Sequence, residues 1–155
     1  MVDDLGREVF LGGPPTRIVS LVPSITETLF AIDAGARVVG TTPFCVEPAA
    51  ARSRERVGGP KNPDVEAIRK LGPDLVVASV EENRKEDVEA LTDLGIPVYV
   101  AFPRTIGDGI HLVRNLGDLL GRGETAAAIA GRLEAERASV VADAAASGLP
   151  LRVFC

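Results

Sequence analysis

Ser24 and Glu27 are the first residues whose types and spacing could carry out chemistry, because they follow an apolar run of strand length in SLVPSITETLF. Many α/β enzymes place a nucleophile and its partners at the end of a strand. The Ser-x-x-Glu spacing is also that of a capping box, in which both side chains bond to backbone groups at a helix start. We therefore interpret the pair as the start of a helix, with catalysis as the alternative.

A hydrolytic serine would need a base, and the chain's single histidine, His111, is poorly placed for that role. At helical spacing His111 shares a face with Asp108, Asn115 and Asp118, which is typical of a solvent-exposed face. No expected strand is followed by G-x-G-x-x-G, and GGPKN at 58–62 lacks the spacing of a phosphate-binding loop. We therefore predict that the chain is not an enzyme and carries no cofactor.

The composition is that of one ordinary domain, with 155 residues, 46% of them hydrophobic. No apolar run approaches the roughly 18 residues that indicate a membrane span. The formal net charge is −5, from 22 acidic and 17 basic residues, and the sequence has no basic run. We expect no nucleic-acid partner, because such binding needs cations that displace counterions from phosphates. A small molecule or another protein is the expected partner.

The two cysteines, Cys45 and Cys155, lie far apart and have no histidine near them. The sequence therefore indicates neither a metal site nor a disulfide framework. The first ten residues, MVDDLGREVF, lack the basic and apolar regions of a signal peptide. This fits either a cytosolic protein or one whose signal has been removed.

Apolar segments of strand length alternate with helical patterns along the chain. These segments are rich in valine and isoleucine and nearly continuous, as strands buried on both faces are. The expected strands are 17–22, 37–42, 74–80, 96–102 and 151–155. A short hairpin strand is expected before them, around Arg7–Leu11.

Helices are expected between the strands because cap residues precede apolar stripes. The expected starts are Ser24 with Glu27, Asn62 before Pro63, Asn83 with Glu86, and Thr105 with Asp108. Gly95 and Gly121 are expected just past helix ends. The alternation predicts an α/β fold, a doubly wound parallel sheet of the Rossmann-like kind.

Five stretches occur in the order and spacing of one protein family: DLGREVFL, PPTRIVSLVPSITETLF, VVGTTPFC, VGGPKNPDVEAIRKLGPDLVVAS and LTDLGIPVYVAFP. The chain resembles, over nearly its whole length, the amino-terminal half of the helical-backbone (type III) periplasmic substrate-binding proteins. These proteins serve ABC importers for siderophores, haem and cobalamin. The stretch PDVEAIRKLGPDLVVA is the most specific, and in detail the chain looks like the subgroup named helical backbone metal receptors.

The resemblance implies that the chain has three structural parts. Residues 1–122 would be an α/β ligand-binding lobe, 123–147 a rigid connector helix, and 148–155 the first strand of a second lobe that this chain lacks. It implies that the protein binds a ferric siderophore, haem or corrinoid and delivers this metal chelate to an ABC permease. Its location would be the periplasm, or the cell envelope through a lipid anchor. The alternative is a cytosolic α/β enzyme or regulatory domain that uses the same strand-end cleft.

A ligand should meet the loops at the carboxyl ends of the strands. The residues expected to bind it are Ser24, Phe44, Cys45, Pro60, Lys61, Ser79, Glu81, Asn83, Arg84 and Arg104. Of these, Phe44, Pro60, Lys61 and Ser79 match positions at which relatives contact their ligands. Lys61, Arg84 and Arg104 favour an anionic chelate, and a chain without tryptophan offers little flat surface for a corrin ring.

The resemblance also implies two protein contacts. Glu66 matches a position at which relatives carry a glutamate that docks onto the permease. The connector helix carries an apolar stripe of Ile129, Leu133, Val140 and Val141 that a missing lobe would leave exposed. We therefore expect the chain to be at least partly a homodimer.

Overall fold

Short segments rich in valine and isoleucine form the centre of the structure, a computed structural model that describes residues 1–147. Five strands lie parallel in the order β3-β2-β1-β6-β7. Their bounds are β1 Ile18–Ser20, β2 Val38–Thr41, β3 Glu55–Arg56, β6 Leu75–Ser79 and β7 Val98–Ala101. A separate antiparallel hairpin is formed by β4 Gly58–Gly59 and β5 Asn62–Pro63.

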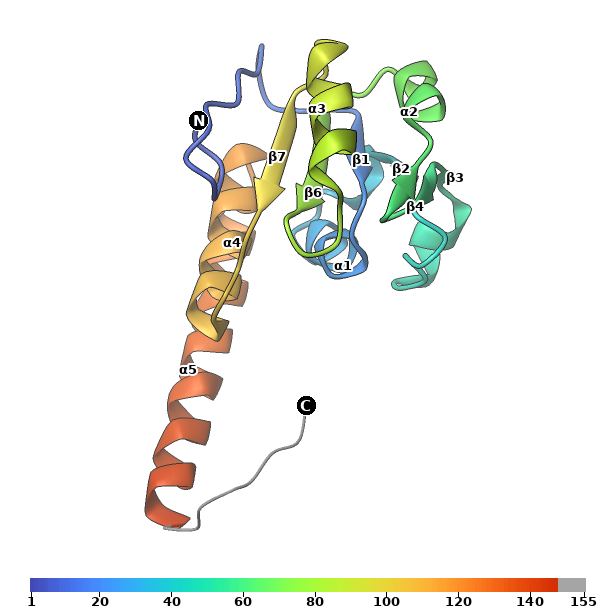
Figure 1. The fold of residues 1–155 in the computed structure, drawn as a ribbon. Helices are drawn as coiled ribbons and strands as arrows, with labels where there is room; N and C mark the ends of the chain where they lie inside the picture. The colour runs from blue at the N-terminus through green and yellow to red at the C-terminus, as the bar shows by residue number, and fades with distance from the viewer. Residues whose placement is uncertain (148–155) are drawn as a thin grey trace.

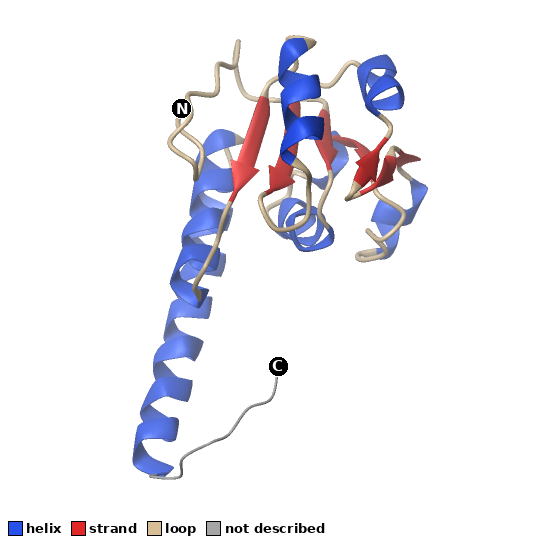
Figure 2. Ribbon diagram, in the orientation of Figure 1, coloured by secondary structure: helices blue, strands red, loops and turns tan. Residues whose placement is uncertain are grey.

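Helices cover both faces of the sheet (Figures 1 and 2). One face carries α1 Pro23–Ala31, α4 Ile106–Leu119 and α5 Gly123–Ser147, and the other carries α2 Val65–Leu71 and α3 Lys85–Asp93. Short 3₁₀ turns occupy Gly35–Arg37 and Ala49–Ser53.

Successive strand residues face opposite helical layers. In β1, Ile18 packs with the α1, α4 and α5 side chains, whereas Val19 packs with those of α2 and α3. In β6, Val77 packs with the α1, α4 and α5 side chains, whereas Val76 packs with those of α2 and α3. Strands β1, β6 and β7 are buried on both sides, which explains why their sequences are largely apolar, whereas the edge strand β3 is exposed. The predicted doubly wound fold is confirmed.

The predicted strands at 17–22, 37–42, 74–80 and 96–102 each contain one strand of the sheet. The fifth, 151–155, lies outside the described residues. The strand expected around Arg7–Leu11 is wrong, because the structure has only an isolated bridge between Val2 and Glu8 there.

The amino-terminal segment instead covers the edge strand β7 with two carboxylates. Asp4 accepts hydrogen bonds from Tyr99 Oη at 2.7 Å and from the Phe102 amide at 2.8 Å. Asp3 is buried and accepts from the Arg7 guanidinium at 2.7 Å. Burial and the bond to Asp4 raise the pKa of the Tyr99 hydroxyl, which stays a donor. These bonds occupy polar groups that an open sheet edge would expose.

Thr105 and Asp108 form the predicted capping box at the start of α4. The Asp108 amide donates to Thr105 Oγ1 at 3.1 Å, and the Thr105 amide donates to the Asp108 carboxylate at 2.9 Å. The bond from the Arg104 amide is the largest cause that lowers the pKa of Asp108. Gly95 and Gly121 have φ of 75° and 63° just past α3 and α4, as predicted.

The other predicted caps are wrong. Helix α1 begins two residues early, with Val22 at the cap position and Pro23 as its first residue, because a proline ring is already set for the first helical position. Ser24 therefore lies inside the first turn and makes no cap bond there. Helix α2 is capped by Asp64 rather than Asn62, and α3 follows Arg84 rather than Asn83.

Helix α5 packs on the lobe only along its first half. Gly117 of α4 allows this close approach, because a Cβ at that position would collide with Cβ of the buried Ala126. The predicted long helix is confirmed, and at about 1.5 Å per residue its 25 residues extend about 37 Å. Residues 131–146 are all exposed, and Figure 1 shows this half extending past the lobe.

The caps provide a direct test of the helix starts. Thr105→Ala should lower the free energy of unfolding by about 1 kcal/mol, because an amide at the start of α4 loses its acceptor. Ser24→Ala is the matched control and should change it by less than about 0.5 kcal/mol. Urea denaturation followed by circular dichroism measures both values. An equal loss in the two variants would contradict the observed helix starts.

Candidate functional site

The carboxyl ends of the parallel strands lie at one edge of the sheet, and the connecting loops gather there. Strand order reverses between β1 and β6, which is where open α/β sheets bind their ligands. The turn of the β4–β5 hairpin, Pro60–Lys61, belongs to the same group because Asn83 bonds to it from the loop after β6. The arrows of β6 and β7 in Figure 1 point toward the side on which α5 extends.

Buried polar side chains support this edge. Those in the described part of the chain are Asp3, Ser20, Thr26, Thr41, Thr42, Ser79 and Asn83. All except Asp3 lie at the carboxyl end of a strand, in the loop that follows it, or on the first turns of α1. A buried polar group is costly unless it is hydrogen-bonded, so these residues need defined partners.

Cys45 and Thr26 join the first two loops. The Thr26 hydroxyl lies 2.8 Å from Ser20 Oγ and 3.1 Å from Cys45 Sγ. The thiol also lies 3.3 Å from Thr42 Oγ1 and is completely buried. The structure therefore corrects the expectation for Cys45, whose sulfur is enclosed by hydroxyls and is not available to a ligand.

Arg56 was not singled out by its sequence, yet it holds the loop after β2. Its guanidinium donates to Thr41 Oγ1 and to the Thr42 carbonyl, each at 2.7 Å. Arg56 belongs to β3, which is two residues long and too short to show a periodic pattern. A charged residue at a strand edge carries no signal for this role without the fold.

Asn83 and Ser79 lie beneath the loop after β6 and do not project from it. Asn83 is 6% exposed, accepts from the Ser79 amide and donates to the Pro60 carbonyl, both at 2.9 Å. Ser79 is 7% exposed, and its hydroxyl accepts from the Glu81 amide. Asn83 was expected to contact a ligand directly, but in the structure its side chain bonds only to backbone groups of the protein.

Phe44, Lys61 and Glu81 are exposed above this support. Phe44 is 63% exposed, and its ring lies 3.7 Å from where a Cβ on Gly59 would stand. Lys61 Nζ donates to the Glu81 carbonyl at 2.6 Å. An aromatic ring, an ammonium group and a carboxylate-bearing loop are thus brought together from three separate segments.

Arg84, Arg104 and Ser24 lie away from that group. Arg84 lines a cavity of about 350 Å³ on the α3 flank, together with Leu5 and Val88. Arg104 follows β7, and its guanidinium lies 5.8 Å from the centre of the Phe102 ring. Arg104 and Ser24 therefore line other surfaces, whereas the Arg84 cavity is also lined by Ser79 and Asn83, which support the loop after β6.

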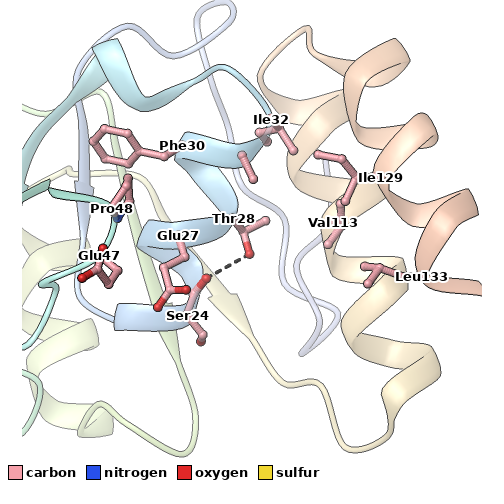
Figure 3. Close-up of a pocket in the computed structure, with 11 residues that line it drawn as sticks. Ser24, Glu27, Thr28, Phe30, Ile32, Glu47, Pro48, Val113, Ile129 and Leu133 are labelled. Carbon is pink, nitrogen blue, oxygen red and sulfur yellow. Dashed lines mark hydrogen bonds between the residues drawn. The ribbon is translucent and has the colours of Figure 1, made fainter. Parts of the chain in front are cut away.

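Ser24 lines a groove of about 780 Å³ between α1 and the α4–α5 pair (Figure 3). Val113, Ile129 and Leu133 form its wall on the side of α4 and α5. Thr28 donates to the Ser24 carbonyl at 2.9 Å, so its hydroxyl is used within α1. The sequence carries no local signal for this groove, because its two walls come from helices about ninety residues apart.

Glu66 lies in the first turn of α2 and pairs with Arg69. The two side chains make bonds of 2.7 and 2.8 Å, and both are more than half exposed. The bond from Arg69 is the largest cause that lowers the pKa of the Glu66 carboxyl. The glutamate is therefore an exposed, ionised group at physiological pH.

Residues 1–147 contain no group of three or more histidine, cysteine, aspartate or glutamate side chains arranged to hold a metal ion. None of their helices is both long enough and apolar enough to pass through a bilayer. His111 is exposed on α4, as predicted.

Comparisons with known proteins identify the family. The vitamin B12-binding protein of Vibrio campbellii is 32% identical over 97 residues, which are 63% of this chain and 35% of that protein. The crystal structure of the periplasmic vitamin B12-binding protein of Vibrio cholerae matches with a TM-score of 0.80 and 27% identity over 90% of this chain. The periplasmic haem-binding protein of Roseiflexus sp. RS-1 matches with a TM-score of 0.73 and 26% identity over 79% of this chain.

The chain spans 54% of the Vibrio cholerae structure and 48% of the Roseiflexus structure, so it corresponds to about half of each. The family described as periplasmic binding protein matches residues 18–154. Because this match covers most of the sequence, the chain belongs to the periplasmic binding protein family.

Proposed function

We propose that this chain is a ligand-binding lobe of a substrate-binding protein that carries a metal chelate to an ABC permease. The observation that supports this most strongly is the group formed by Phe44, Lys61 and Glu81 above a buried polar support. Membership of the periplasmic binding protein family favours a role in binding and a location in the cell envelope. The chelate would be held non-covalently, without a reaction.

The exposed groups favour a flat or anionic chelate. Phe44 presents a ring that can pack against a macrocycle, and Lys61 presents an ammonium group that can pair with a carboxylate. Relatives are described as binding vitamin B12 or haem. A haem carries carboxylates that Lys61 could pair with, whereas a corrinoid would rely more on the ring of Phe44. The proposed ligand class is therefore a haem, ferric siderophore or corrinoid.

Haemin and cyanocobalamin test this proposal by titration into residues 1–155. We expect dissociation constants well above ~1 μM, because one open edge covers only one side of a ligand. Lys61→Ala should weaken haemin binding about two- to fivefold, since an exposed charged contact contributes modestly. Lys70→Ala, an exposed lysine of α2, is the control and should have no effect. Submicromolar binding would contradict a site that is shared between two lobes. No detectable binding of either probe would remove haem and corrinoid from the proposed ligand class.

We further propose that Glu66 contacts a permease. A permease arginine could replace Arg69 as its partner, and the carboxylate is accessible for this exchange. In the native protein, Glu66→Arg should leave the affinity for chelate unchanged and reduce chelate uptake, because it places like charges together. Glu89→Arg is the matched control, since Glu89 is also a helix glutamate in an exposed ion pair. If both variants take up the chelate equally well, Glu66 does not dock onto the permease.

We also propose that the exposed half of α5 pairs with a second copy of the chain. Val140 and Val141 are 61% and 59% exposed, and they line a groove of about 550 Å³ with Ile106 and Ile110 of α4. Light scattering coupled to size exclusion should show dimers at micromolar concentration, reduced by the double variant Val140→Glu and Val141→Glu. A monomer at that concentration would contradict this pairing.

A further inference from the structure

Asn83 connects two loops of the carboxyl edge through both ends of its side-chain amide. From the loop after β6, its Oδ1 accepts from the Ser79 amide at the end of β6, and its Nδ2 donates to the Pro60 carbonyl in the hairpin turn. The side chain is 6% exposed. An amide group can accept and donate at once, whereas an aspartate at neutral pH only accepts. Asparagine therefore suits a position between one backbone donor and one backbone acceptor.

The hairpin turn needs such an anchor because the hairpin is very short. Its strands pair only Gly58 with Pro63 and Gly59 with Asn62. An isolated two-stranded hairpin is marginal in water, and this one has two residues in each strand. The placement of Lys61 at its tip must therefore depend on bonds to other segments.

Two bonds supply that support from the loop after β6. One is the Asn83 bond to Pro60, and the other is the Lys61 bond to the Glu81 carbonyl at 2.6 Å. The first is partly buried, while the second is on the surface, where water competes for the ammonium group. The asparagine bond is thus the stronger constraint on the turn.

We propose that Asn83 is a positioning residue, which holds the Pro60–Lys61 turn against the loop after β6 and so sets where Lys61 meets a ligand. It does this without touching the ligand itself. The ligand part of this inference rests on the proposed function, whereas the coupling of the two loops does not. The loops then form one unit, so a contact on either loop is transmitted to the other.

Backbone ¹⁵N relaxation of residues 1–155 tests the coupling without any ligand. In Asn83→Ala, which can make neither bond, the heteronuclear NOE of Lys61 should fall from a value near that of the sheet to that of a mobile loop. The strands β1 and β6 should keep their values. Asn115→Ala is the matched control, since Asn115 is a partly buried asparagine that donates to Tyr99 Oη instead. An unchanged NOE at Lys61 in Asn83→Ala would overturn the proposal.

Asn83→Asp adds a second measurement, the pH dependence of the Lys61 NOE, which a general loss of stability would not explain. A protonated carboxyl group can both accept from Ser79 and donate to Pro60, but the ionised form cannot donate. Between pH 4 and 9, the Lys61 NOE in this variant should fall as the pH rises, while the natural chain should show no such transition. A Lys61 NOE that stays at the sheet value in Asn83→Ala, whatever the aspartate variant does, would show that other contacts hold the turn.

Haemin titration tests the ligand part separately. If Asn83 acts through Lys61, then Asn83→Ala and Lys61→Ala should weaken haemin binding to a similar extent, and the double variant should lose little more. Fully additive losses would overturn the positioning role. If the natural chain binds neither haemin nor cyanocobalamin, haem and corrinoid are excluded as its ligands, and relaxation still decides the coupling.

Discussion

Hydrogen bonding of buried polar groups is the constraint on which the arrangement of this edge depends. The carboxyl ends of β1, β2 and β6 end in serine or threonine, and these residues are buried. A buried hydroxyl without a hydrogen-bond partner would destabilise the folded state, so each of these groups needs a partner. Ser20 is paired with Thr26 of α1, Thr41 accepts from Arg56 of β3, and the Ser79 hydroxyl accepts from the Glu81 amide. The sheet edge and the loops are therefore built as one hydrogen-bonded unit.

In this arrangement, the residues that support the loops differ from those that are exposed to a ligand. Below the surface, the buried groups hold backbone positions, and above it Phe44 and Lys61 remain free of buried partners. Preorganised loops lose less conformational entropy on binding than mobile ones, so a rigid support favours affinity. The long helix α5 adds a second rigid part, because it extends past the lobe on the side toward which the strands point. Both features suit capture of a ligand with small movements of the backbone.

The sequence predicted the elements whose signals are local. Strands buried on both faces are recognisable as continuous apolar runs, and the Thr105 cap is recognisable because it has the capping-box spacing to Asp108 and the residue directly before it is not a proline. The predicted Ser24 cap was wrong because Pro23 takes the first helical position, which moves the helix start by two residues. Cys45 and Asn83 failed as ligand contacts because their burial is set by segments from elsewhere in the chain. A sequence shows that a residue lies in a loop, but only the packed structure shows whether its side chain faces out or in.

The central claim is that the loops at the carboxyl edge form the ligand-binding surface of this lobe. Mapping of backbone amide chemical shifts during addition of cyanocobalamin, and separately of haemin, tests it most directly, because the method detects weak binding and locates it. The account predicts that the shifts concentrate on Phe44, Lys61, Glu81 and their neighbours. Shifts concentrated at the opposite end of the sheet, around the cavity lined by Pro14, Asp74 and Pro97, would contradict it.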